Sequence, residues 1–83
     1  MDCMYLIYVI KSISHGTRYI GSCKDVNVRL QEHNNGVSRY TSGRRPWILI
    51  YTESYATRTD ARKRELFLKS GQGREWLDTK GYK

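Results

Sequence analysis

The chain has few of the residues that build cross-links, and it has no long apolar run. Its 83 residues include only two cysteines, Cys3 and Cys23, which are far apart and have no second pair. This excludes the paired spacing of a zinc site and the framework of a disulfide-rich domain, so we expect both to be reduced packing residues. No apolar segment approaches the roughly 18 residues of a membrane span.

The first apolar segment, residues 4–10, is too short for the core of a signal peptide, and no basic region precedes it. We therefore expect a cytoplasmic protein that does not associate with a membrane. Neither a linker nor an internal repeat is visible, and a chain of this length supports one core. We expect one domain over residues 1–83.

Acidic residues are also scarce, because 8 Asp and Glu oppose 15 Lys and Arg and give a formal net charge of +7. A basic excess of this size favours a polyanionic partner. The alternative is a basic domain with no role in binding nucleic acid.

Three segments are predicted to be strands, at residues 5–10, 18–21 and 47–52. The first and third are apolar throughout, which is typical of a strand covered on both faces. Polar residues between the first two segments predict a hairpin, which brings Tyr8 and Tyr19 close together.

Three helices are predicted from caps and periodicity. The first runs to about Asn35, where Gly36 is its stop. Its cap is either Asp25, or Ser22 in a capping box with Asp25 one turn earlier. The second opens at Thr57, where Asp60 completes a capping box, and it ends near residue 70. A short last helix is expected over residues 73–80.

The first predicted helix carries a basic pair. Arg29 and His33 are four residues apart and therefore share a helix face, and Tyr19 ends the strand that leads into this helix. A phenol, a guanidinium and an imidazole on one small surface can hold a phosphate and move a proton.

The second long helix contains an anomalous carboxylate. Glu65 falls on the same stripe as Ala61 and Leu68, the stripe that should face the sheet. A buried carboxylate is unfavourable unless it is paired or binds a cation. Two interpretations stay open: an ion pair with Arg62 or Lys69, or a metal site.

Residues 37–46 predict a loop that carries three arginines around Tyr40 and Thr41. This composition suits phosphate binding, although a solvated loop would look the same. The candidate nucleic-acid contacts are Lys24, Arg39, Arg44 and Arg45.

The motifs LIY at residues 6–8 and YIG at residues 19–21 resemble the two halves of the GIY-YIG nuclease signature. The resemblance continues, in the same order, with Arg29, His33 and Glu65. It is closest to small stand-alone members related to the nuclease domain of UvrC. Two departures are visible: Leu6 replaces the first Gly of the signature, and no Asn follows Asn35.

The resemblance implies an α/β (α+β) fold, with a small three-stranded, antiparallel-containing sheet flanked by about three helices. It also implies cleavage of DNA phosphodiesters, dependent on Mg²⁺ or Mn²⁺, in repair or recombination. Mapped onto this chain, Tyr8 and Tyr19 are the signature tyrosines, Arg29 binds the phosphate, His33 is the histidine of many members, and Glu65 is the metal ligand.

One of the two tyrosines, Tyr8 in the first instance or else Tyr19, is expected to accept a proton from the attacking water while passing its own to His33. The sequence does not decide which of them acts. Three other functions stay open: a DNA-binding domain with little or no cleavage, a cleavage module that depends on a protein partner for specificity, and a protein-interaction domain.

Overall fold

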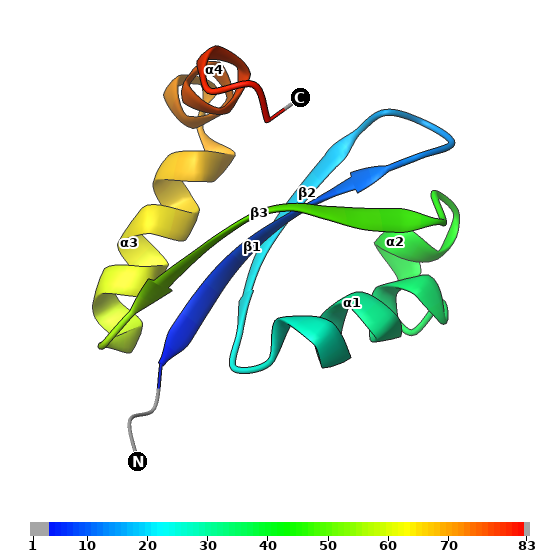
Figure 1. The fold of residues 1–83 in the computed structure, drawn as a ribbon, viewed down its shortest axis with the longest axis horizontal. Coiled ribbons are helices and arrows are strands. Elements are labelled where there is room, and N and C mark those ends of the chain that lie inside the picture. Colours follow the sequence, from blue (N-terminus) through cyan, green and yellow to red (C-terminus); the bar gives the residue numbers. More distant parts are fainter. Residues whose placement is uncertain (1–3, 83) are drawn as a thin grey trace.

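A three-stranded antiparallel sheet lies between two pairs of helices in the computed structural model, which describes residues 4–82 (Figure 1). The strand order is β2-β1-β3. In chain order the elements are β1 (Tyr5–Ser12), β2 (Arg18–Cys23), α1 (Val26–Asn34), α2 (Arg39–Ser42), β3 (Trp47–Tyr55), α3 (Arg58–Lys69) and α4 (Gly71–Thr79). The predicted α/β (α+β) class is confirmed. The sheet is antiparallel throughout.

The central strand β1 is covered on both faces, as its unbroken apolar sequence predicts. Ile7 and Val9 pack in the cluster formed with α3 and α4, whereas Tyr8 and Ile10 pack with residues of α1 on the opposite face. This division follows from the alternation of side chains along a strand. One face therefore holds most of the aliphatic core, and the other holds the polar residues of interest.

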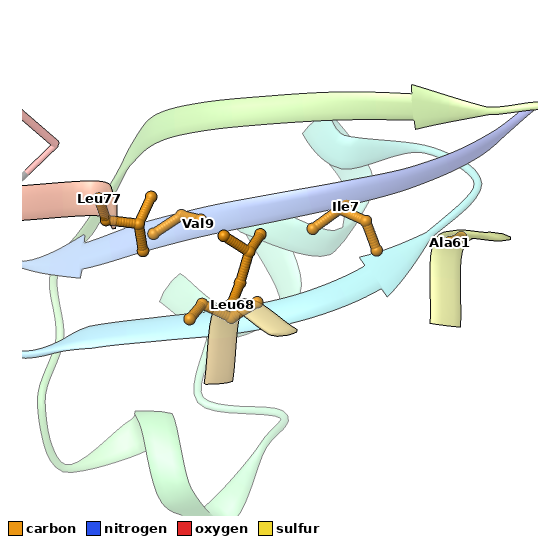
Figure 2. Close-up of a cluster of buried hydrophobic side chains, with 6 residues drawn as sticks. Ile7, Val9, Ala61, Leu68 and Leu77 are labelled. Carbon is orange, nitrogen blue, oxygen red and sulfur yellow. The ribbon is translucent and has the colours of Figure 1, made fainter. Parts of the chain in front are cut away.

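The aliphatic core depends on close contact between β1 and the two carboxyl-terminal helices. Figure 2 shows Leu68 of α3 reaching between Ile7 and Val9 of β1, with Leu77 of α4 beside Val9. All four side chains are fully buried. Gly73 permits the approach of α4 to α3, because a Cβ at this position would lie 2.0 Å from the Phe67 carbonyl oxygen.

The helix caps agree with the sequence. The Asp25 carboxylate accepts from the Val28 N–H at 3.1 Å, and the Thr57 hydroxyl accepts from the Asp60 N–H at 3.2 Å. Gly36 has a φ of +80°, the left-handed conformation that lets the chain leave α1.

The prediction of a loop throughout residues 37–46 was wrong, because α2 forms within it. The Ser42 N–H donates to the Ser38 carbonyl at 2.9 Å, which closes this single turn. Four residues are too few to show a helical period, so no sequence pattern reveals the turn. The turn matters because it buries Thr41 completely.

Asn34, the last residue of α1, holds the first residue of β3. Its side-chain amide donates to the Trp47 carbonyl at 3.0 Å and accepts from the Trp47 N–H at 2.6 Å. The Trp47 indole N–H then donates to the Thr41 carbonyl at 2.9 Å. These bonds attach α1 and α2 to the sheet.

Strand β3 continues three residues beyond its predicted end at residue 52. Glu53 interrupts the apolar pattern, but its carboxylate accepts from the hydroxyls of Tyr51 and Tyr55 and from the guanidinium of Arg64. Burial alone would raise the pKa of Glu53, yet these donors hold it below its usual value. The Arg64 guanidinium also lies 4.6 Å from the ring centre of Trp76, so the cluster ties β3 to α3 and α4.

Cys23 is a half-buried free thiol whose pKa is raised by burial, as expected for a packing residue. Cys3 lies outside the described residues. Among the helices of residues 4–82, none is long and apolar enough to cross a membrane.

Candidate active site

A chain of buried hydrogen bonds links Tyr8, His33 and Thr41. The Tyr8 hydroxyl lies 2.9 Å from Nε2 of His33, and Nδ1 of His33 lies 2.7 Å from the Thr41 hydroxyl. Thr41 donates to the carbonyl of Ser38 at 3.4 Å. Because that carbonyl can only accept, Thr41 accepts from Nδ1–H, and Nε2 is left to accept the proton of Tyr8.

Gly21 provides the space that the Tyr8 ring occupies. The two residues are partners across β1 and β2, and a Cβ on Gly21 would lie 2.4 Å from the Tyr8 hydroxyl oxygen. The glycine of the YIG motif is therefore required here for space. It allows the phenol to lie over β2 and to reach His33.

Tyr19 lies beside this chain of bonds, as the hairpin predicts. Its ring centre is 6.4 Å from that of Tyr8 and 5.0 Å from that of His33, which it meets edge-on. Tyr19 is partly exposed, whereas Tyr8 is 1% exposed. Among the described residues, the hydroxyl bonded to His33 is that of Tyr8.

Arg29 and His33 leave α1 on the same side but lie at different depths. His33 is fully buried, while the Arg29 side chain is 38% exposed and pairs with the Glu32 carboxylate at 2.9 Å. Arg29 also lies beside the Tyr8 hydroxyl. The predicted convergence of phenol, guanidinium and imidazole is therefore present.

The surroundings of Tyr8 and His33 set the protonation states of the two side chains. Burial raises the pKa of Tyr8 to about 12, although Arg29 opposes the shift. Burial, and then the positive charge of Arg29, lower the pKa of His33 below its ordinary value. At neutral pH the phenol is therefore protonated and the imidazole is neutral.

Glu65 lies on the other face of the sheet, on α3. It is 6% exposed and, with Ala61 and Leu68, forms the predicted buried stripe. The Lys69 ammonium lies 2.7 Å from its Oε2, so Lys69 is the ion-pair partner. Within residues 4–82, no hydrogen bond joins Glu65 to Tyr8, His33 or Thr41.

Two hollows lie along the free edge of β2. The first, which we call the Tyr19 hollow, has a volume of about 720 Å³ and is lined by Gly16, Thr17, Arg18, Tyr19, Ile20, Tyr40, Lys69, Arg74 and Asp78. The second, the Lys24 hollow, has a volume of about 540 Å³ and is lined by Tyr5, Ser22, Cys23, Lys24, Arg58, Ala61 and Arg62.

The linings of the hollows place Glu65 between them. Ala61 and Arg62 line the Lys24 hollow, and Lys69 lines the Tyr19 hollow. Glu65 is one helical turn from both Ala61 and Lys69 on the same stripe of α3. The edge of β2 therefore connects the face that carries Tyr19 with the face that carries Glu65.

The predicted nucleic-acid contacts are divided by the structure. Lys24, Arg39 and Arg45 are exposed, and Arg45 also donates to the Ser42 carbonyl at 2.8 Å. Arg44 is half-buried and lies 4.7 Å from the centre of the Tyr40 ring. Thr41 lies in the same basic segment of the sequence as these arginines, but its side chain is buried against His33. Its role could not be foreseen, because no pattern in the sequence pairs it with His33.

The structure also identifies residues that the sequence reasoning missed. Arg18 and Arg74 join Lys69 in the Tyr19 hollow, and Arg58 and Arg62 join Lys24 in the other. Their only signal was the general basic excess, because each hollow is assembled from segments that are distant in sequence.

The donor set limits the metals that fit. Within the described residues, no group of three or more His, Cys, Asp or Glu side chains is placed to hold an ion. A single carboxylate such as Glu65 suits Mg²⁺, which keeps several of its own waters, and does not suit Zn²⁺, which takes three or four protein ligands.

The chain matches known proteins over most of its length. The family model of the GIY-YIG catalytic domain matches residues 4–81. UPF0213 proteins of Staphylococcus aureus strains Mu3 and N315 are 43% identical over 67 residues, which cover 80% of this chain and 80% of each relative. The solution NMR structure of a UPF0213 protein from Bacillus halodurans has a TM-score of 0.58 and 27% identity, and the match covers 94% of this chain and 85% of that one.

Proposed function

Because the chain belongs to the GIY-YIG family, we propose that it is an endonuclease that hydrolyses DNA phosphodiesters with the help of Mg²⁺ or Mn²⁺. One observation carries the proposal: the buried chain of hydrogen bonds from Tyr8 through His33 to Thr41, with Arg29 beside it. It supplies a path for a proton next to a group that binds phosphate.

Tyr8 and His33 act together as the general base. As water attacks phosphorus, its proton goes to the Tyr8 oxygen while the Tyr8 proton passes to Nε2 of His33. The bond between phosphorus and the 3′ oxygen breaks, and that oxygen takes a proton from solvent. His33 is needed as the final acceptor of the proton, because a phenol with a pKa of about 12 does not ionise unaided at neutral pH.

Arg29 binds the non-bridging oxygens of the phosphate. Its planar guanidinium offers two parallel donors, which suits the charge that builds on these oxygens in the transition state. In the structure Glu32 occupies one of these donors at 2.9 Å. Substrate binding therefore exchanges one anion for another at Arg29.

Glu65 is the residue that would hold the metal. Mg²⁺ held there would supply neutralisation of charge on the phosphate. An ion on Glu65 would compete with the Lys69 ammonium, which bonds to Oε2 in this structure and can give up that bond. The released ammonium can then bind phosphate in the Tyr19 hollow, which it already lines.

The path proposed for DNA follows the free edge of β2. Lys24, Arg58 and Arg62 line one hollow, and Arg18, Lys69 and Arg74 line the other. Three cations in each hollow can neutralise phosphates of a bound strand. This path passes both Tyr19 and Glu65.

A second candidate function is binding of DNA without cleavage. The ion pair between Glu65 and Lys69 favours it, because this pairing satisfies the carboxylate without a metal. A partner protein that displaces Lys69 and supplies specificity would then be needed for cleavage. We propose the cytoplasm as the location of either activity, and DNA repair or recombination as its setting.

Cleavage assays on Glu65→Gln test the proposal. We expect Mg²⁺-dependent cutting of labelled DNA by the parent and none by Glu65→Gln, with DNA binding retained. Glu75→Gln on the exposed side of α4 removes the same charge and should cut normally. Equal cutting by all three proteins would refute the metal role of Glu65. If the parent binds DNA but never cuts it, the domain is a binding module.

A further inference from the structure

Tyr40 is an exposed aromatic residue that is held in place on two sides. Half of its surface is accessible, yet its ring centre lies 4.7 Å from the Arg44 guanidinium carbon and 5.8 Å from the ring centre of Tyr19. Several aliphatic side chains are equally exposed, which is ordinary for single residues. Tyr40 differs from them because it lines the Tyr19 hollow.

Arg44 serves as support for this ring. Its Nη1 donates to the Tyr40 carbonyl at 3.4 Å, and its Nε is buried with no hydrogen-bond partner among the described residues. Arg44 keeps its place against the Tyr40 ring although its Nε has no hydrogen bond there, which indicates that the contact with the ring is favourable. The contact between the two side chains, at 4.7 Å, holds the Tyr40 ring in place before any ligand arrives.

The rest of the hollow is suited to a sugar-phosphate backbone. Arg18, Lys69 and Arg74 outnumber the single carboxylate of Asp78, which pairs with Arg18 at 2.7 Å. These cations come from β2, α3 and α4, whereas Tyr40 comes from α2 on the opposite layer. A strand in the hollow therefore meets an aromatic ring on one side and positive charge on the other.

We propose that Tyr40, supported by Arg44, stacks against an unpaired nucleobase, so that the preferred substrate carries an unpaired nucleotide at this position. Aromatic platforms beside a basic groove bind single-stranded nucleic acid in this way, and with little dependence on base identity. In a continuous duplex each base is already stacked and must be extruded first. This inference rests on the proposed function, because it presumes that a nucleic-acid strand enters the Tyr19 hollow.

A binding experiment tests the platform apart from cleavage. The probes are a fluorescent thymidine oligonucleotide of about twelve residues, and the same oligonucleotide with abasic sites at its centre, in buffer with EDTA. The abasic probe keeps every phosphate and loses only bases, so the electrostatic part of binding is matched. We expect the parent to bind the intact probe at least about fivefold more tightly.

Variants then assign the preference to Tyr40. Tyr40→Ala should bind both probes equally, Tyr40→Phe should keep the preference, and Val37→Ala, an exposed change in the same loop, should behave as the parent. The inference is overturned if the parent shows no preference, or if Tyr40→Ala retains it.

The same proteins separate this inference from the proposed function. Cleavage in Mg²⁺ without any preference for the intact probe would support the nuclease function and refute the stacking role of Tyr40. A base preference that depends on Tyr40, without cutting, would support the platform and remove the nuclease.

Discussion

Gly21 stands opposite Tyr8 across β1 and β2, and a methyl group on Gly21 would lie 2.4 Å from the Tyr8 hydroxyl oxygen. The nearest ring carbon would lie 2.6 Å from that methyl group. The hydrogen bond between Tyr8 and His33 thus depends on the lack of a side chain at Gly21.

Gly21→Ala should separate Tyr8 from His33. The methyl group forces the phenol away from β2, and a misplaced base slows catalysis by on the order of 100-fold. Overpacking of this kind should also lower the free energy of unfolding by about 1–3 kcal/mol. Cleavage rates and urea unfolding measure the two effects.

Gly43→Ala is the matched control for that change. No atom lies within 4 Å of a Cβ built on Gly43, and its φ of −79° is open to alanine. It should cut at the parental rate. A Gly21→Ala protein that also cuts at the parental rate would show that the position of Tyr8 is unimportant.

The lowered pKa of His33 makes stability depend on pH. The unfolded chain binds a proton near pH 6.5, while the folded protein binds it only at lower pH. The stabilisation is therefore complete above about pH 6.5 and falls as the pH drops from there through the folded pKa. Urea unfolding between about pH 5 and pH 8 should show this decline in the parent and not in His33→Gln.

Cleavage should fall in the same acidic range, because a protonated imidazole cannot accept the Tyr8 proton. His15 lies on the exposed hairpin turn, and His15→Gln should keep the parental profile. Parallel pH–rate profiles for His33→Gln and the parent would remove His33 from the proton path.

Glu32→Gln should strengthen DNA binding. The change frees Arg29 from its partner, and a partly exposed ion pair of this kind is worth up to about 1 kcal/mol, or about fivefold in affinity. Glu75→Gln changes the net charge equally at a distant site and corrects for the general electrostatic gain. If both variants gain the same affinity at one salt concentration, Arg29 does not bind phosphate.

Leu68→Ala should lower the free energy of unfolding by about 2–5 kcal/mol, because it leaves a cavity between α3 and β1. Leu66→Ala on the same helix alters a side chain that is 54% exposed and should change it by no more than about 0.5 kcal/mol. Urea unfolding of the two variants beside the parent compares them directly. Equal losses would contradict the division of α3 into a buried and an exposed face.

Features set by neighbours along the chain could be predicted from the sequence. The caps at Asp25 and Thr57 were predicted because a cap acts over three residues, and the buried stripe through Glu65 because a helix repeats every turn. The pairing of Glu65 with Lys69 is of the same kind. So is the nearness of Tyr8 to Tyr19, since a hairpin brings its two strands together.

Features set by packing between distant segments could not be predicted. Thr41 reaches His33 only because α2 folds beneath α1, and Glu53 belongs to β3 only because Arg64 of another element balances its charge. The irregular pairing between Val9 and Ile10 shifts the register of β3 and leaves no mark in the sequence. The two hollows likewise exist only once α3 lies along β2.

The hydrogen bonds between Asn34 and Trp47 also hinder pairing of β3 with a strand of another molecule. In a strand, the N–H and C=O of one residue point to the same side, so both polar groups of Trp47 face α1 and are already occupied. Strand β3 is an edge strand, and beyond Trp47 it exposes the apolar Ile48 and Leu49. An unoccupied edge of this kind is a template for strand-to-strand aggregation. One amide side chain therefore closes the edge of β3 at Trp47 to pairing with another chain.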